Sequence, residues 1–302
     1  MNIILTYDTE EPGQCIPKLR TILGVHTKFD APLTIFVVGN LLYQEGEELK
    51  GLISEAPELW DVNSHSYSHA RMLPKAPWSE ELSSAEEVYE ETAKGVQIVR
   101  DMLNQPCRGF RPRTGAGAGF RGCPTHLDAA RTAGCQWTSA YLRSVFADAL
   151  PGDLSPPYTY QPDGFDEIIE MPGHGWQDCM LKQFRDWSTF GVRWPSEHAY
   201  PQKLCKTPEE EFAVYKVTMD AAEAAGLPFC CFVMHPWTMI HDRDPQGKAI
   251  ELVLGYANKK GWGISTLDAE ATRCRQEPGL LTETPPIPPT RIPGYDVAQH
   301  FA

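Results

Sequence analysis

Apolar runs and amphipathic segments alternate along most of the chain. Dense apolar runs with β-branched and aromatic residues predict buried strands over residues 2–8, 32–38, 167–171 and 228–234, and further strands are predicted over 61–63, 108–111, 136–145 and 263–267. Between these runs, apolar residues recur at helical spacing, which predicts helices over residues 15–29, 47–56, 79–104, 124–134, 207–226 and 246–259. Strands that alternate with helices predict an α/β fold with a parallel sheet.

Two of the predicted helices carry clear start signals. Ser79 is a good N-cap for the longest of them, and the glutamates that follow suit its positive end. Thr207 precedes Pro208, a residue type favoured at the first helical position, and Glu210 lies three residues after this second cap. We therefore expect these helices to begin next to Ser79 and Thr207.

Two segments lack a periodic pattern. Residues 172–203 are rich in Gly, Pro, His and aromatic residues, and a loop of this length is often functional. Its indoles, Trp176 among them, could pack the loop on the protein body or wall a sugar-binding cleft, and both uses are compatible. Residues 276–302 are proline-rich and predict an extended tail, which leaves residues 1–275 as the folded domain. Such a tail can lie on its own domain or on a neighbouring subunit, so the protein could form a homo-oligomer.

Composition narrows the range of functions. The net charge of −13 argues against nucleic-acid binding, which needs a basic surface, and favours a neutral or cationic substrate. No apolar run approaches the ~20 residues of a membrane-spanning helix. The nine cysteines are odd in number and form no C-x-x-C pair, and the first residues lack the features of a signal peptide. These features predict a cytoplasmic protein without a disulfide framework.

Several ionisable residues directly follow predicted strands. Asp8, Glu10, Arg111 and His235 lie at or just after the carboxyl ends of such strands, and a histidine pair follows the strand over 61–63. In a (β/α) barrel these ends converge on one face, where active sites lie. About seven strand–helix units fit a barrel better than a doubly wound sheet, although periodicity alone does not separate the two. The placement of the ionisable residues favours the barrel.

The histidine pair lies in the sequence H-S-Y-S-H, from His65 to His69. Two imidazoles at this spacing share one face if the chain coils there, and they could then occupy two corners of a metal site that a carboxylate and water complete. The alternative is an exposed pair on a loop, because this spacing also arises by chance. The ionisable residues at the other strand ends favour the metal site.

Together these residues provide the groups needed for metal-assisted hydrolysis of an amide or ester. His65, His69 and one carboxylate could hold a divalent ion, which lowers the pKa of a water molecule from about 15.7 toward about 7. A second carboxylate could take the proton as general base. Arg111 could orient that carboxylate through a bidentate pair, and His235 is placed to donate a proton to a leaving nitrogen or oxygen.

Four short motifs follow one another in the chain. They are T-Y-D-T-E at residues 6–10, H-S-Y-S-H at 65–69, F-R-P-R-T-G at 110–115 and V-M-H-P at 233–236. In this order and spacing they resemble the motifs of the polysaccharide deacetylases, the chitooligosaccharide deacetylase homology family (carbohydrate esterase family 4), over roughly residues 1–270. The resemblance implies a distorted (β/α)7 barrel and metal-dependent removal of acetyl groups from N-acetyl sugars.

The resemblance also implies roles for individual residues. Asp8 matches the catalytic base of the family, Arg111 the residue that orients this base, and His235 the acid. His65 and His69 match the metal ligands. We expect zinc, which suits two imidazoles and a carboxylate, although other divalent ions could bind the same ligands.

The first motif departs from the commonest pattern of the family, in which two adjacent aspartates occur and the second binds metal. Thr9 occupies that second position here, whereas Glu10 has the spacing of those members that carry the carboxylate two residues after the base. Positions 8 and 10 of a strand also share a face. We therefore expect Glu10 to be the third ligand. The alternatives are a solvated Glu10 with a weak or absent metal site, or a contribution of Thr9 through a water.

The second motif departs as well, because Asn63-Ser64 precedes the first histidine in place of the usual Gly-Asn. Together with D-T-E, this resembles the intracellular, small-substrate members of the family, which include metal-independent allantoinases. Our first hypothesis is a metal-dependent N-deacetylase that acts on a small or oligomeric amino sugar. Tyr67, Trp176 and Trp237 are the candidate substrate-binding residues.

Three other functions are open. A cyclic-amide hydrolase similar to the allantoinases would work with little or no metal. An inactive carbohydrate-binding protein on the same barrel would not require Asp8, Arg111 and His235 together. A glycoside hydrolase with Asp8 and Glu10 as its acid pair would leave the histidines unexplained, and carboxylates so close on one strand are poorly placed to straddle a bond.

Overall fold

The computed structural model describes residues 1–73, 83–113, 115, 117–143, 151–182 and 203–282. Its strands are β1 (Asn2–Thr9), β2 (Leu33–Val37), β3 (Trp60–Ser64), β4 (Gly109–Phe110), β5 (Trp137–Thr138), β6 (Tyr158–Tyr160), β7 (Phe165–Glu170), β8 (Phe229–Met234) and β9 (Gly263–Ile264). Its helices are α1 (Cys15–Lys28), α2 (Leu42–Glu55), α3 (Ala85–Leu103), α4 (Pro124–Thr132), α5 (Asp178–Lys182), α6 (Pro208–Ala224), α7 (Pro236–Met239), α8 (Lys248–Lys260) and α9 (Leu267–Gln276).

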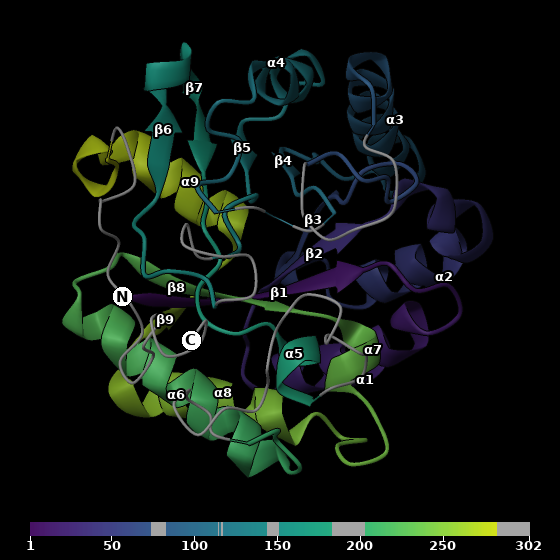
Figure 1. Ribbon diagram of the computed structural model, residues 1–302. Coiled ribbons are helices and arrows are strands. Elements are labelled where there is room, and N and C mark those ends of the chain that lie inside the picture. The colour runs from purple at the N-terminus through teal and green to yellow at the C-terminus, as the bar shows by residue number, and fades with distance from the viewer. Residues whose placement is uncertain (74–82, 114, 116, 144–150, 183–202, 283–302) are drawn as a thin grey trace.

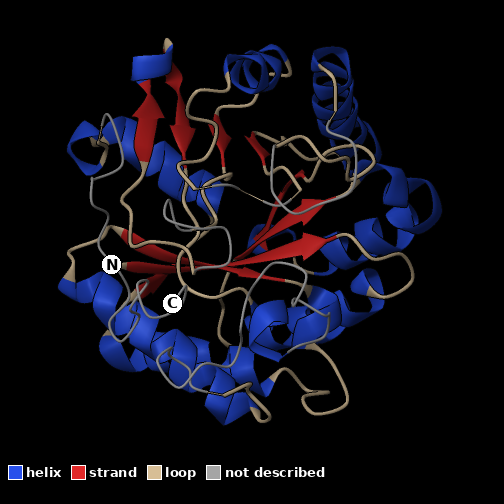
Figure 2. Cartoon of the chain, in the orientation of Figure 1, coloured by secondary structure: helices blue, strands red, loops and turns tan. Residues whose placement is uncertain are grey.

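The strands lie at the centre of the molecule and helices surround them (Figure 1; Figure 2). The strands pair in the order β6-β7-β5-β4-β3-β2-β1-β8, and β9 pairs with the first residues of β1. All these pairs are parallel except that of β6 with β7. Strands β2 and β8 are buried along their whole length, as expected for a parallel sheet that helices cover.

Strand pairing does not close the sheet within the described residues, and one histidine bridges part of the gap between β7 and β8. The backbone N–H of His174 donates to the carbonyl of Cys231 (2.7 Å), and Nδ1 of His174 accepts from the Cys231 N–H (3.0 Å). Nε2 of the same ring donates to the carbonyl of Ser155 (2.8 Å). Seven strands, from β7 across to β8, are parallel neighbours, so the predicted distorted (β/α)7 barrel is confirmed.

Helix α9 packs against the amino-terminal end of this barrel. Leu267 and Ala271 of α9 form one apolar cluster with Ile4 of β1, Phe36 of β2 and Phe229 of β8. The larger apolar core lies between the strands and the other helices. Because the amino-terminal end is filled in this way, the carboxyl end is the one that remains for a binding site.

Elements with a strong periodic pattern lie where the sequence predicts them, and weaker ones were missed. Helix α6 follows its predicted cap, Thr207, whose hydroxyl accepts from the Glu210 N–H. Strands β5 and β9 are shorter than predicted, since each ends after two residues. Strand β6 and helices α5, α7 and α9 were not predicted. They are short or contain few apolar residues, so their periodic signal is weak.

The predicted start of the longest helix was wrong. Helix α3 begins at Ala85, and Ser84 caps it instead of Ser79, which lies outside the described residues. The Ser84 hydroxyl accepts from the Glu87 N–H, and the Glu87 carboxylate accepts from the Ser84 N–H. This reciprocal capping box satisfies two backbone donors, which fixes the start of the helix more strongly than a single cap does.

One residue of the predicted tail, Thr282, extends the sheet next to β6, after a 3-10 helix at Pro278–Leu280. The carbonyl of Thr282 accepts from the Thr159 N–H, and the Thr282 N–H donates to the carbonyl of Pro157, each at 3.1 Å. Residues 283–302 lie outside the described residues.

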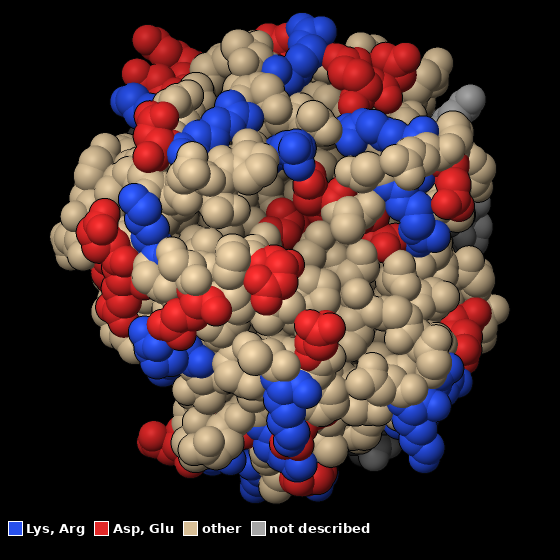
Figure 3. All heavy atoms as spheres, turned by 180° about the vertical axis from the view of Figure 1, so that it is seen from behind, with Lys and Arg blue, Asp and Glu red and all other residues tan. Residues whose placement is uncertain are grey.

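Among the described helices, none combines the length and the apolar composition that a membrane span needs. On the face seen from behind, acidic and basic side chains are interspersed (Figure 3).

Candidate active site

Strand β1 places Asp8 inside the barrel near its carboxyl end, where Arg111 holds it. Asp8 is 4% exposed and Arg111 is completely buried, and Nη1 of Arg111 lies 2.7 Å from Oδ1 of Asp8. Nη1 also donates to the hydroxyl of Thr6 (2.8 Å), and Nη2 donates to the hydroxyl of Ser139 (2.9 Å). The guanidinium stacks on the Phe36 ring at 3.9 Å.

The expected bidentate pair between Arg111 and Asp8 was therefore wrong. Only one nitrogen of Arg111 contacts the carboxylate, because Ser139 takes the other end of the guanidinium. Oδ2 of Asp8 consequently faces the histidine cluster, at 3.8 Å from Nε2 of His65. A carboxylate fixed through one oxygen presents the second oxygen as a proton acceptor.

The histidine pair lies on an irregular loop after β3, not on a helical turn. Ser66 and His69 adopt positive φ angles of 64° and 62°, so the expected coiling of the chain was wrong. The loop is held by backbone contacts: the His65 N–H donates to the carbonyl of Val37 (2.8 Å), and the Gly39 N–H donates to the carbonyl of Ser66 (2.9 Å). Non-glycine residues in this region of φ persist only where the surroundings enforce the conformation.

Helix α3 supports this loop through a glycine. A Cβ atom at Gly95 would lie 2.6 Å from both Oγ of Ser64 and the carbonyl carbon of Ser66. Such a separation is shorter than any van der Waals contact, so only glycine permits this approach. The position of the histidines thus depends on a helix that the sequence analysis did not connect with the site.

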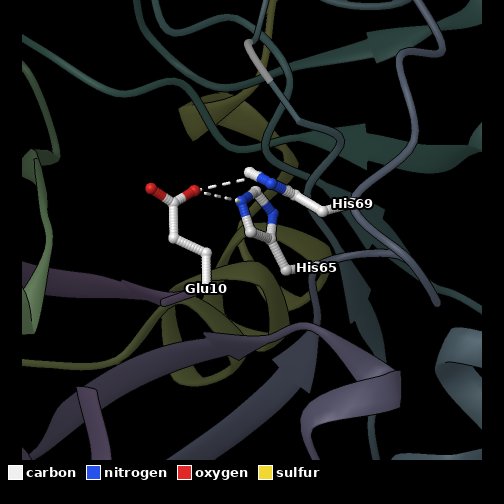
Figure 4. A group of neighbouring side chains, drawn as sticks. All are labelled: Glu10, His65 and His69. Carbon is white, nitrogen blue, oxygen red and sulfur yellow. Dashed lines mark ion pairs between the residues drawn. The ribbon is translucent and has the colours of Figure 1, made fainter. Parts of the chain in front are cut away.

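Glu10, His65 and His69 converge on one point (Figure 4). Oε2 of Glu10 lies 2.9 Å from Nε2 of His69 and 3.8 Å from Nε2 of His65. One potential ligand atom from each residue lies within 4.8 Å of the other two. Thr9 is directed elsewhere, because its hydroxyl donates to the carbonyl of Tyr7. Of the two residues that follow Asp8, Glu10 therefore lies beside the histidines and Thr9 does not.

The protonation states of this cluster suit a metal ion. Burial by itself raises the pKa of Glu10, but hydrogen bonds from His65 and His69 and the nearby His235 outweigh it and hold that pKa well below its ordinary value. Burial lowers the pKa of His69. Nδ1 of His65 donates to the carbonyl of Arg111 (2.9 Å), so Nε2 is the nitrogen that faces Glu10. A carboxylate and imidazole nitrogens oriented in this way are ligands that a divalent ion takes.

His235 lies on the opposite side of Glu10, where Asp178 holds it. Nδ1 of His235 donates to Oδ1 of Asp178 (2.7 Å), and the backbone N–H of His235 donates to Oδ2 (2.8 Å). Burial alone would lower the pKa of His235, but the Asp178 carboxylate, with Glu10 and Asp8, outweighs it and raises that pKa to about 9. Nε2 of the charged ring lies 3.9 Å from Oε1 of Glu10. The ring can therefore donate a proton toward the cluster.

Asp178 was not among the predicted site residues. It begins α5, well beyond the end of β7 at Glu170, so the rule that selected residues at or just after strand ends did not reach it. It lies in the segment without periodicity, whose place in the barrel the sequence did not reveal. The hydroxyl of Thr238, also missed, donates to Oδ2 of Asp178 and helps to orient it.

The three candidate substrate-binding residues have different surroundings. Trp176 is 2% exposed and belongs to the core, which favours a packing role. Tyr67 contacts Lys94 of α3, outside the Glu10 cluster. Trp237 is partly buried, and its indole N–H donates to Oε1 of Glu10 at 3.3 Å. Of the three, Trp237 lies at the cluster, and the assignment of all three to substrate binding stays a prediction.

Comparison with known proteins agrees with these motifs. Residues 2–138 match the family model of the polysaccharide deacetylases. No curated protein sequence matches the chain significantly.

Solved structures share the fold along most of the chain. A protein of Mycobacterium smegmatis named for the same family has a TM-score of 0.67 and 16% identity, over 94% of this chain and 92% of that one. The Puue allantoinase has a TM-score of 0.63 and 14% identity, over 91% and 90%. BA3943 of Bacillus anthracis, described as a pseudoenzyme of the CE4 family, has a TM-score of 0.54 and 15% identity, over 89% and 65%.

At these identities the structural likeness establishes the fold alone, and the similarity to the polysaccharide deacetylases rests on residues 2–138. The likeness extends the barrel assignment over residues that the family model does not cover. Residues 2–138 of the chain thus match the polysaccharide deacetylases, and the described chain has the fold of the solved structures named above.

Proposed function

We propose that the protein is a metal-dependent hydrolase that removes an N-acyl group, with acetyl as the first choice, from an amino sugar or a small N-acyl compound. One observation carries the proposal. A fixed carboxylate, Asp8, and a protonated imidazole, His235, flank the cluster of Glu10, His65 and His69. Hydrolysis of an amide needs a base for water, an acid for the amine, and stabilisation of the carbonyl oxygen.

Glu10, His65 and His69 would hold the metal ion, for which we expect zinc. When bound, such an ion would polarise the acyl carbonyl and acidify a water molecule. Arg111 is engaged with Asp8, Thr6 and Ser139, so it maintains the base and leaves the ligand positions to the other three residues.

The proton transfers are assigned to two residues. Oδ2 of Asp8 accepts a proton from the attacking water while Arg111 keeps Oδ1 in place. Nε2 of His235 donates a proton to the leaving nitrogen as the carbon–nitrogen bond breaks, and Asp178 orients the ring throughout. The products are the free amine and the carboxylic acid, so the atoms of one amide and one water are accounted for.

A small substrate and a cytoplasmic setting are part of the proposal. All nine cysteines lie in the described part of the chain, and no disulfide joins any of them there. Reduced thiols in this number are typical of proteins from reducing compartments. A substrate inside the cell would be a small N-acyl sugar or an oligosaccharide.

Release of acetate tests the proposal. The purified protein is assayed on N-acetylglucosamine and its oligomers before and after removal of metal with a chelator. We expect acetate release that the chelator abolishes and added Zn²⁺ restores. If acetate release is unaffected by metal removal, the metal-dependent mechanism is wrong. If a ring amide such as allantoin is hydrolysed instead, the chain resembles the allantoinases in activity as well as in fold.

A further inference from the structure

We propose that Trp237 is a positioning residue of the metal centre, whose indole N–H holds one oxygen of Glu10 so that the other faces His65 and His69. The inference rests on the proposed function, because it assigns a residue to the same site. It concerns Glu10, which lies two residues after Asp8, whereas the commonest pattern of the family has an aspartate directly after the catalytic base.

The two oxygens of Glu10 have different partners. Oε2 lies 2.9 Å from Nε2 of His69 and 3.8 Å from Nε2 of His65. Oε1 lies 3.3 Å from Nε1 of Trp237 and 3.9 Å from Nε2 of His235. One oxygen of the carboxylate thus faces the imidazole nitrogens of His65 and His69, and the other faces the ring nitrogens of Trp237 and His235.

Glu10 needs such a partner more than an aspartate would. It lies just after β1, beyond the last residue that pairs with β2. Its side chain has one methylene more than an aspartate, and therefore one more torsion to be fixed. Hydrogen bonds from outer groups to ligating carboxylates orient them and strengthen metal binding. A donor to Oε1 fixes that extra torsion with Oε2 toward the histidines.

Trp237 is itself held in place by surrounding contacts. It belongs to α7, the short helix that begins directly after His235. Its carbonyl accepts from Nζ of Lys18 (3.2 Å), and its side chain packs against the apolar core. The ring centroids of Trp237 and His235 lie 5.7 Å apart. One helix therefore positions both the acid and the residue that orients Glu10.

The affinity for Zn²⁺ tests the inference, measured by competition with a chromophoric chelator. Trp237→Phe keeps an aromatic ring but removes the N–H, and we expect it to weaken Zn²⁺ binding about 10–100-fold, the range typical of outer partners of metal ligands. Trp262→Phe is the matched control. The Trp262 indole also donates to a glutamate, Glu223, at 2.8 Å, but next to β9 at the other end of β1. We expect this control to bind Zn²⁺ like the wild type.

A double-mutant cycle sharpens the test. In a Glu10→Asp background the shorter side chain cannot reach both the histidines and Trp237. Adding Trp237→Phe should therefore change the affinity for Zn²⁺ little further. An equal loss in both backgrounds would show that Trp237 acts on the site in some other way than through Glu10, and would overturn the inference.

The outcomes separate the inference from the proposed function. If the wild type binds no Zn²⁺, the proposed metal site fails. If the wild type binds Zn²⁺ and Trp237→Phe binds it equally well, only the role of Trp237 fails. If Trp237→Phe does not fold, indole ¹⁵N–¹H spectra of the wild type test the role of Trp237 instead. One indole resonance should move both on addition of Zn²⁺ and in metal-free Glu10→Gln, and the absence of such a resonance contradicts the inference.

Discussion

Both ends of the barrel contain ionisable groups linked by hydrogen bonds, but the two ends use these groups differently. At the amino-terminal end, Oδ2 of Asp61 accepts from the Thr34 hydroxyl (2.9 Å) and the Asp268 N–H (3.1 Å), and Oδ1 accepts from the amide of Asn63 (2.6 Å). Asp268 in turn accepts from Arg108 (2.7 Å) and from the indole of Trp137. These groups join α9 to the strands.

At the carboxyl end, the hydrogen bonds leave a set of atoms directed at one point. Arg111 takes one oxygen of Asp8, and Asp178 takes Nδ1 of His235. The other oxygen of Asp8, Oε2 of Glu10 and Nε2 of His65 then face one another. A polar cluster whose groups are paired with one another stabilises the fold. A cluster whose acceptor atoms converge on one point can instead bind a ligand and take part in a reaction.

The largest effect is expected from Asp8→Asn at the carboxyl end. The amide cannot accept a proton as the carboxylate does, so kcat should fall by about 10²–10⁴-fold, the usual contribution of a general base. Zn²⁺ binding should persist, because Asp8 is not one of the three proposed ligands. Acetate release and Zn²⁺ affinity are measured together. A variant that keeps full activity would remove Asp8 as the base.

Acidification is expected to lower the free energy of unfolding through His174, the histidine that bridges β7 and β8. Burial lowers the pKa of His174 to about 4, so the ring stays neutral in the folded protein while its unfolded counterpart takes up a proton below its ordinary pKa of about 6.5. This contribution to stability is present above pH 6.5 and is lost as the pH falls toward 4, by on the order of 3 kcal/mol.

The test compares urea unfolding of wild type and His174→Asn between pH 7 and pH 4. The asparagine oxygen can still accept from the Cys231 N–H but does not titrate. The free energy of unfolding should therefore depend less steeply on pH in the variant. His26, whose pKa burial also lowers to about 4, contributes equally to both proteins. Equal slopes would show that His174 does not carry this dependence.

Gly95→Ala should disturb the carboxyl end from outside the site. The added methyl group would meet Ser64 and Ser66, so the histidine loop must shift. We expect a loss of about 1–3 kcal/mol in the free energy of unfolding, together with weaker Zn²⁺ binding. Gly51→Ala in α2, where no atom lies within 4 Å of the new methyl group, is the control and should be slightly stabilising. Unchanged Zn²⁺ affinity in Gly95→Ala would mean that α3 does not position the histidines.

The smallest effect on activity is expected at the amino-terminal end. Thr34→Val removes a donor to Asp61 and the acceptor of the Leu267 N–H while keeping the shape of the side chain. The free energy of unfolding should fall by about 1–3 kcal/mol, because buried groups lose their partners. Turnover and Zn²⁺ affinity should not change. A loss of turnover in the folded variant would break the contrast between the two ends.

The sequence predicted the residue types of the site better than their geometry. Period-two spacing continued past the end of β1 placed Glu10 with Asp8, and the strand ends located His235 and Arg111. The loop conformation of the histidines was not predictable from their spacing, since it depends on the close approach of Gly95 from a distant helix. The single contact between Arg111 and Asp8 depends in the same way on Ser139.

Contacts between distant segments set the limit of prediction in the fold as well. Asp178 reaches His235 across 57 residues, and His174 reaches Cys231 across the same separation. Neither pair has a local signal, because the partners meet only after the barrel has formed. Helix α3 shows the opposite case, in which a local signal existed at Ser84 and Glu87 but a weaker one at Ser79 was preferred.

The metal content of the purified protein tests the central claim most directly. It is measured for the wild type and for the double variant His65→Ala/His69→Ala after loading with Zn²⁺ and removal of the excess. We predict close to one ion per chain in the wild type and almost none in the double variant, with both proteins folded. Equal amounts in the two proteins, or none in either, would contradict a metal centre formed by Glu10, His65 and His69.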